Sequence, residues 1–273
     1  MPVGDTLLVM AAGCLAGLMG TLLGLGGGIF LIPFLVAALG LPFGLARGIS
    51  LMTVIATSSA VASGGPARAL INLRLAMLLQ AVTAAGGLAG GLTAAHLSER
   101  ALTALFGVVM LAVGLVMIRR LDRRNVVLDG SLEPGPFGGR FYEHESGREV
   151  SYQLRRLPVA VAVAFAGGNV SSLLGLGGGI VLVPALNAFC GVPMRVAAAT
   201  SSFMIGVTAV SAVPIYYARG EVVPHLAAAA VVGVLAASRL GLRFAVRARA
   251  RSLKLLMIAV LLTVAGVMFL RLR

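Results

Sequence analysis

Two glycine clusters occupy matching places in the two halves of the chain, and their residues are the best suited to chemistry. The stretch GLGGGIFLIPFL starts at Gly24, and GLGGGIVLVPAL starts at Gly175, 151 residues later. Each pattern predicts a break in the backbone, followed by a helix that begins near Ile29 or Ile180. The first amides of a helix lack intrahelical acceptors, and the helix dipole adds partial positive charge there. Because glycine has no Cβ, an anion can approach such a backbone closely.

The predicted anion site combines these backbone amides with polar side chains from the neighbouring apolar segments. Hydroxyl and amide groups can bind an oxyanion without placing a fixed counter-charge inside a membrane. Structural interpretations stay open beside this one, since small residues also permit close helix packing and membrane Ser and Thr often bond their own helix backbone. The predicted substrate-binding residues are Gly26, Gly27, Gly28, Gly177, Gly178, Gly179, Ser50, Thr53, Asn169, Thr200, Ser201 and Ser202.

Other kinds of site find little support in the sequence. In GLGGGI the last glycine of a dinucleotide fingerprint is replaced by Ile29, and no GK[ST] follows to make a phosphate-binding loop. Carboxylates such as Glu99 and Glu221 lie at the edges of apolar segments, which disfavours a buried proton relay. No metal-ligand spacing or nucleophile–base arrangement appears. We therefore predict neither an enzyme nor a cofactor or metal site.

Composition indicates an all-α polytopic membrane protein. Hydrophobic residues make up 59% of the 273-residue chain and charged residues 11%, and the apolar residues form long blocks. About 20 apolar residues of helix cross a bilayer. Each half holds five apolar segments: 6–23, 27–40, 46–64, 70–95 and 101–119 in the first, and 158–174, 178–190, 196–216, 224–242 and 253–270 in the second.

The two halves read as homologous repeats. Shifting the chain by 151 residues aligns 21–118 with 172–269 without a gap, matching prolines and hydroxyl residues such as Ser50 with Ser201. We predict one repeat over 1–120 and the other over 158–273. In each repeat the two short segments flanking the glycines form either one broken span or a hairpin of two half-helices.

A polar segment, 121–157, separates the repeats. It contains six of the nine acidic residues together with turn signals such as EPGP and FGG, which predict a solvent-exposed cytoplasmic loop. Within it, RFYEHESGREVSYQL alternates around an SG turn and predicts a small hairpin. This loop is the basis of an alternative function, a membrane scaffold or assembly protein. Deleting it would separate the two hypotheses, because a carrier would still transport whereas a scaffold would lose its partner.

The distribution of charge predicts the topology. The net charge of +13 comes from basic residues between apolar blocks, which points to cytoplasmic loops beside anionic lipid and not to nucleic acid. A hairpin plus three spans is an odd number, so the repeats would be inverted. The Arg195 loop and the 239–254 cluster would then be cytoplasmic, with Arg47 and the Arg219–Glu221 pair in outside loops. A parallel arrangement would place the 239–254 cluster outside, whereas the arginines at the C-terminus count against inversion.

The paired glycine motifs, followed by LPFGLARGIS and VPMRVAAATSS, resemble the TauE/SafE sulfite exporter family. The resemblance covers nearly all of the chain except 121–156. It implies a multi-pass carrier in a prokaryotic plasma membrane, which moves a small inorganic or organosulfur anion such as sulfite by alternating access. The coupling ion, a proton or sodium, the direction of transport and the oligomeric state stay open. Ile49 stands where the second repeat has Thr200, which predicts that the second half contributes more hydroxyl contacts.

Overall fold

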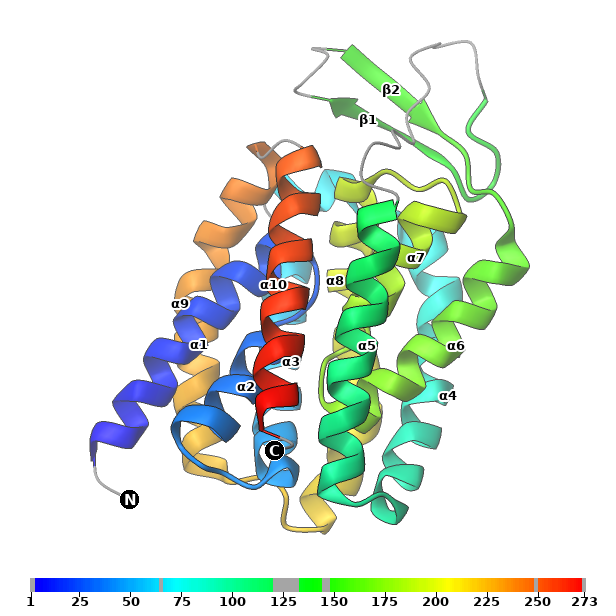
Figure 1. Cartoon of the computed structure of the whole chain (residues 1–273). Coiled ribbons are helices and arrows are strands. Elements are labelled where there is room, and N and C mark those ends of the chain that lie inside the picture. The colour runs from blue at the N-terminus through cyan, green and yellow to red at the C-terminus, as the bar shows by residue number, and fades with distance from the viewer. Residues whose placement is uncertain (1–2, 64–65, 120–132, 144–147, 248–249, 272–273) are drawn as a thin grey trace.

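Ten α-helices and a two-stranded sheet form the described part of the chain (Figure 1). The computed structural model describes residues 3–63, 66–119, 133–143, 148–247 and 250–271. The helices of the first half are α1 (Val3–Leu23), α2 (Gly28–Ala38), α3 (Phe43–Ala62), α4 (Leu73–Thr93) and α5 (Glu99–Arg119), with short 3₁₀ turns at Pro66–Leu70 and Ala94–His96. Those of the second half are α6 (Leu157–Leu174), α7 (Gly179–Phe189), α8 (Met194–Ala218), α9 (Pro224–Arg247) and α10 (Ala250–Leu270).

Eight of the described helices are long and apolar enough to cross a membrane, while α2 and α7 are shorter apolar helices. Large apolar side chains face outward on the long helices, among them Leu15, Met77 and Leu92, which are 65%, 63% and 59% exposed. Such a surface suits hydrocarbon and not water. The predicted all-α polytopic membrane fold is confirmed.

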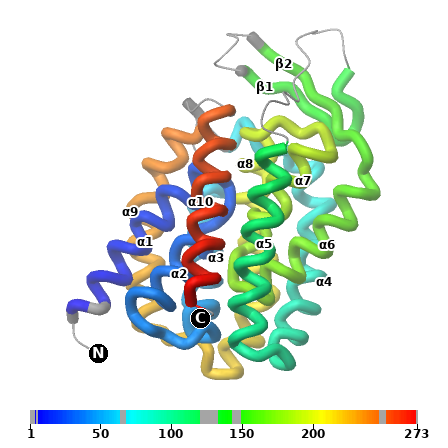
Figure 2. Tube along the Cα trace, viewed as in Figure 1, coloured from blue at the N-terminus to red at the C-terminus, as the bar shows by residue number. Residues whose placement is uncertain are grey.

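Each short helix is one arm of a hairpin. The sixth residue of each is proline, Pro33 in α2 and Pro184 in α7. The amide of Arg155, just before α6, donates to the carbonyl of Cys190, just after α7, at 2.8 Å. The chain therefore enters and leaves this hairpin at the same end of the bundle. Figure 2 shows α1 and α2 arranged likewise, which favours two hairpins over two broken spans. The first arm of each hairpin, α1 or α6, is nevertheless long enough to cross a membrane, and only the second arm is a short helix.

The two halves interlock. Helix α1 packs against α9, and α6 packs against α4, while α3 packs against α8 and α5 against α10. These are corresponding pairs if the halves are repeats. In Figure 1, α5 and α10 lie side by side and run in opposite directions. Inverted repeats would produce this arrangement, and the repeat itself stays an interpretation of the sequence.

The predicted hairpin is present, as β1 (Gly139–Glu143) and β2 (Arg148–Tyr152). The strands are antiparallel, with Phe141 opposite Val150. Both of these side chains and Tyr152 are buried, so the hairpin has an apolar face. It lies at one end of the helices (Figure 2). The rest of the expected 121–157 loop falls partly outside the described residues, at 121–132 and 144–147.

The sequence had suggested that Arg47 and Arg195 lie in loops, but both lie in helices. Arg47 lies in α3 and is 2% exposed, and Arg195 lies in the first turn of α8 and is 6% exposed. The expected loop positions were wrong because both helices begin directly after a proline, Pro42 or Pro193, and so start before the apolar blocks do. Charge is therefore buried inside the bundle.

Candidate functional site

The two glycine breaks meet inside the bundle. A Cβ on Gly28 would lie 2.6 Å from the carbonyl oxygen of Gly175. On the other side, a Cβ on Gly179 would overlap the carbonyl oxygen of Gly24. The segments cross so closely that only glycine fits at these two positions. All six predicted glycines are buried.

Both half-helices begin at these crossing segments with free amides. The first helical bonds run from Phe30 and Leu31 to the carbonyl of Gly27, so the amides of Gly28 and Ile29 have no backbone acceptor in the described chain. At the start of α7, the amides of Val181 and Leu182 donate to the carbonyl of Gly178. The amides of Gly179 and Ile180 therefore also have no backbone acceptor in the described chain. Unbonded buried amides are rare in proteins. Together they present positive dipole ends to the interior of the protein.

The two breaks differ in conformation. Gly177 and Gly178 have φ of +79° and +78°, and Gly26 has φ of +77°, a region that side-chain-bearing residues rarely adopt. Gly27, the counterpart of Gly178, has φ of −70°. The second break therefore needs glycine at two adjacent positions for conformational reasons.

Four buried serine hydroxyls have no hydrogen-bond partner among the described residues. They are Ser171, Ser172, Ser201 and Ser202, each no more than 1% exposed. The Ser171 oxygen would lie 3.5 Å from a Cβ on Gly178, at the start of α7. Since buried polar groups are normally bonded, these hydroxyls are available to a ligand. The sequence had indicated Ser201 and Ser202 but not Ser171.

The other predicted polar residues have partners or lie elsewhere. Ser50 donates to the carbonyl of Gly175 at 2.6 Å, and Thr53 donates to its own helix at the carbonyl of Ser50. Thr200 accepts from the amide of Asn72 at 3.0 Å. Asn169 is half-buried, and its backbone packs against Gly86 and Gly90 of α4. The structure thus brings the six glycines and Ser50 together at the crossing, without gathering Thr53, Thr200 and Asn169 around it.

Sequence reasoning missed a buried cation beside the second break. Arg47 donates to the carbonyl of Leu173 at 3.1 Å and forms an ion pair with Glu221. Its guanidinium carbon lies 4.2 Å from the ring centre of Tyr216. A Cβ on Gly175 would lie 2.7 Å from Arg47 Cγ, so this side chain packs directly on the break. The position of Pro42, which marks the true start of α3, was the signal that could have found it.

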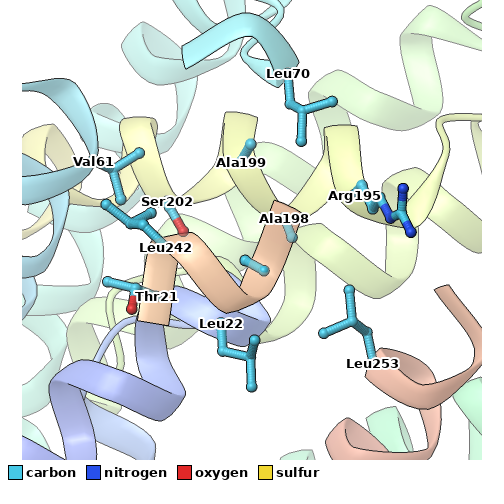
Figure 3. Close-up of a pocket in the computed structure, with 11 residues that line it drawn as sticks. Thr21, Leu22, Val61, Leu70, Arg195, Ala198, Ala199, Ser202, Leu242 and Leu253 are labelled. Carbon is cyan, nitrogen blue, oxygen red and sulfur yellow. The ribbon is translucent and has the colours of Figure 1, made fainter. Parts of the chain in front are cut away.

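A small cavity lies beside the first break (Figure 3). A Cβ on Gly24 would lie 2.5 Å from the Cα of Ala198, which lines this cavity. Figure 3 shows Thr21 and Ser202 at one side and Arg195 at the other. The volume, 20 Å³, is close to what one water molecule needs. An oxyanion of several heavy atoms would enter only if the surrounding helices moved.

Among the described residues, no group of three or more His, Cys, Asp or Glu side chains could hold a metal ion. Fold and site together define a polytopic helical membrane protein with two hairpins, each of one long and one short helix, whose glycine-rich tips meet in the interior.

The chain belongs to the sulfite exporter TauE/SafE family, whose pattern matches residues 9–268. It is also similar to the probable membrane transporter protein YunE of Bacillus subtilis (strain 168), with 24% identity over 264 residues, or 94% of each chain. No solved structure matches the chain significantly. The resemblance drawn from the glycine motifs is confirmed at the level of the family.

Proposed function

We propose that this protein is a secondary transporter that exports a small sulfur-containing oxyanion, such as sulfite or an organosulfonate, across a prokaryotic plasma membrane. The family description and the similarity to a probable membrane transporter support transport of such an anion. One structural observation carries the proposal: two half-helices begin side by side in the interior with unbonded amides and with free hydroxyls nearby. Amide and hydroxyl donors of this kind are what a buried oxyanion requires.

The second break supplies the stronger anion chemistry in this proposal. Amides of Gly179 and Ile180 donate to the oxyanion, and the Ser171 hydroxyl adds a donor at the same helix end. Arg47 packs on this break and contributes positive potential. Its charge is balanced by Glu221, so the interior of the bundle does not hold an uncompensated cation at this break.

Alternating access follows from how the two tips touch. In the closed crossing, the carbonyls of Gly24 and Gly175 occupy the space beside the facing glycines. An anion at the helix starts therefore requires the tips to separate, and separation toward one end or the other would expose the site to one side of the membrane at a time. Breaks from two inverted repeats near the membrane midplane typify secondary transporters. A proton or sodium gradient would drive the cycle.

The test measures sulfite efflux from proteoliposomes. Gly27→Leu and Gly178→Leu are expected to abolish efflux because the added side chain fills the space beside a half-helix start. Gly266→Leu is the matched control, since nothing lies within 4 Å of a Cβ at this exposed position of α10. All variants should insert into the membrane at the wild-type level.

Ser171→Ala guards against the possibility that the larger substitutions disturb folding. The change deletes a hydroxyl that has no partner in the described chain, so the fold should tolerate it. Losing one hydrogen bond to a charged ligand should raise the KM for sulfite about tenfold. Efflux that is undiminished in both leucine variants, together with an unchanged KM in Ser171→Ala, would refute the proposed site.

A further inference from the structure

A second cavity lies between the β-hairpin and the start of α4, away from the glycine breaks. Its volume is 250 Å³, large enough for a small organic anion. The hairpin contributes Arg140, Phe141 and Tyr152 to its walls, and the turn before α4 contributes Asn72. It opens at the hairpin end of the bundle, which is cytoplasmic in the predicted topology.

The polar lining of this cavity is cationic. Arg74 and Arg140 both line it and both are exposed, and neither forms a salt bridge with a described residue. No carboxylate among the described residues lines the cavity. Two arginines without an acidic residue among the described lining give this cavity a positive potential, and a guanidinium binds an oxyanion through paired N–H donors.

A buried hydroxyl adds a neutral donor to the same space. Tyr152 is 4% exposed, and its oxygen accepts a bond from the Asn72 side-chain amide at 2.9 Å. The hydroxyl proton itself has no acceptor among the described residues. Burial raises the pKa of Tyr152 above 10, outweighing the opposing effect of the Asn72 bond, so the proton is retained at neutral pH.

We propose that this cavity, here called the hairpin cavity, binds a small soluble oxyanion such as a phosphate, sulfite or short sulfonate. Arg74 and Arg140 neutralise its charge, and the Tyr152 hydroxyl donates to an oxygen. Leu70, Phe141 and Val196 form apolar wall suited to a short organic substituent. The site is separate from the glycine breaks and does not depend on the proposed transport function.

Asn72 connects the hairpin cavity to the membrane helices. Its side chain donates to Tyr152 and to the carbonyl of Phe137, while its backbone amide donates to Thr200 in α8. Thr200 directly precedes Ser201, one of the hydroxyls predicted to serve the anion site. A ligand that shifts Tyr152 therefore acts on a residue bonded to α8; this last consequence rests on the proposed transport function, in which occupancy of the hairpin cavity should change the transport rate.

The deciding experiment uses ¹⁹F NMR of the full-length protein labelled with 3-fluorotyrosine, in phosphatidylcholine nanodiscs. The chain has four tyrosines, and the Tyr152→Phe variant assigns the resonance of interest. Titration with inorganic phosphate, sulfite and ethanesulfonate should produce a saturable shift of the Tyr152 signal with at least one of them. The double variant Arg74→Gln/Arg140→Gln should weaken this binding by about tenfold or more.

Arg119→Gln is the matched control, because Arg119 is an exposed arginine of α5 that does not line the cavity. It should bind like the wild type, and so should Gly178→Leu, which separates this proposal from the transport site. The absence of a shift with all three anions, or a shift that the double variant leaves intact, would overturn the proposal. If the Tyr152 signal shifts only in phosphatidylglycerol nanodiscs, the ligand is a lipid headgroup, and the proposal of a soluble oxyanion is refuted.

Discussion

The ion pair between Arg47 and Glu221 allows a sharp test of the buried charge beside the second break. It joins α3 to the connection between α8 and α9. The substitution Glu221→Gln keeps the size of the side chain and one acceptor oxygen but removes the charge. The Arg47 side chain is 3% exposed, so its charge would stay in the interior with less compensation.

The expected cost follows from the contacts that remain. Removing one partner of a fully buried ion pair costs about 3–5 kcal/mol. The Glu221 side chain is 22% exposed, so water already screens part of the pair and reduces that cost. Stacking on Tyr216 and the bond to the Leu173 carbonyl continue to stabilise the guanidinium. We expect a loss of about 2 kcal/mol, or about 4–8 °C in Tm for a chain of this size.

Thermal unfolding of the purified protein in detergent measures this loss. Glu99→Gln is the matched control, because Glu99 is exposed at the start of α5, and it should change the free energy of unfolding by less than about 0.5 kcal/mol. In the double variant Arg47→Met/Glu221→Gln no uncompensated charge remains. Its loss of stability should therefore be smaller than the sum of the two single losses, by about 1 kcal/mol or more. A Tm for Glu221→Gln equal to that of the control, or strictly additive losses, would contradict this reasoning.

Two further predictions concern the hairpin. Asn72→Ala removes the helix cap that accepts from the Leu75 amide, together with the bonds to Tyr152 and Phe137. We expect the free energy of unfolding to fall by about 1–2 kcal/mol and proteolysis within residues 139–152 to become faster. Cleavage at the wild-type rate would show that Asn72 does not hold the hairpin. Because burial raises the pKa of Tyr152 above its ordinary value of 10.0, its protonated form stabilises the fold, and that contribution is present below this pH and lost as the pH rises through the folded-state pKa. Absorbance titration of wild type and variant should show that Tyr152→Phe removes a phenol that ionises late.

Much of the fold was predictable because its signals are local. The half-helix starts at Gly28 and Gly179 follow from glycines that need left-handed backbone or close contact, and the turn signals around an SG pair predict the hairpin. What could not be read from the sequence depends on packing between distant segments. Arg47 and Glu221 are 174 residues apart, and nothing near either residue indicates the other. Ser171 became a candidate only when the structure left its buried hydroxyl without a partner.

The same comparison explains why sequence correspondence between the halves does not give two equal anion sites. Ser50 bonds the carbonyl of the opposite break, whereas Ser201, its counterpart at the 151-residue offset, has no partner in the described chain. Arg47 packs on the second break, and at the first break its counterpart is the small Ala198. Arg47 thus packs directly on the second break, where the Ser171 hydroxyl also has no partner in the described chain, whereas Arg195 lines the small cavity beside the first break. An anion passing between the breaks would therefore be held by different donors on its two sides, and substitutions at the second break should affect its affinity more than the matching substitutions at the first.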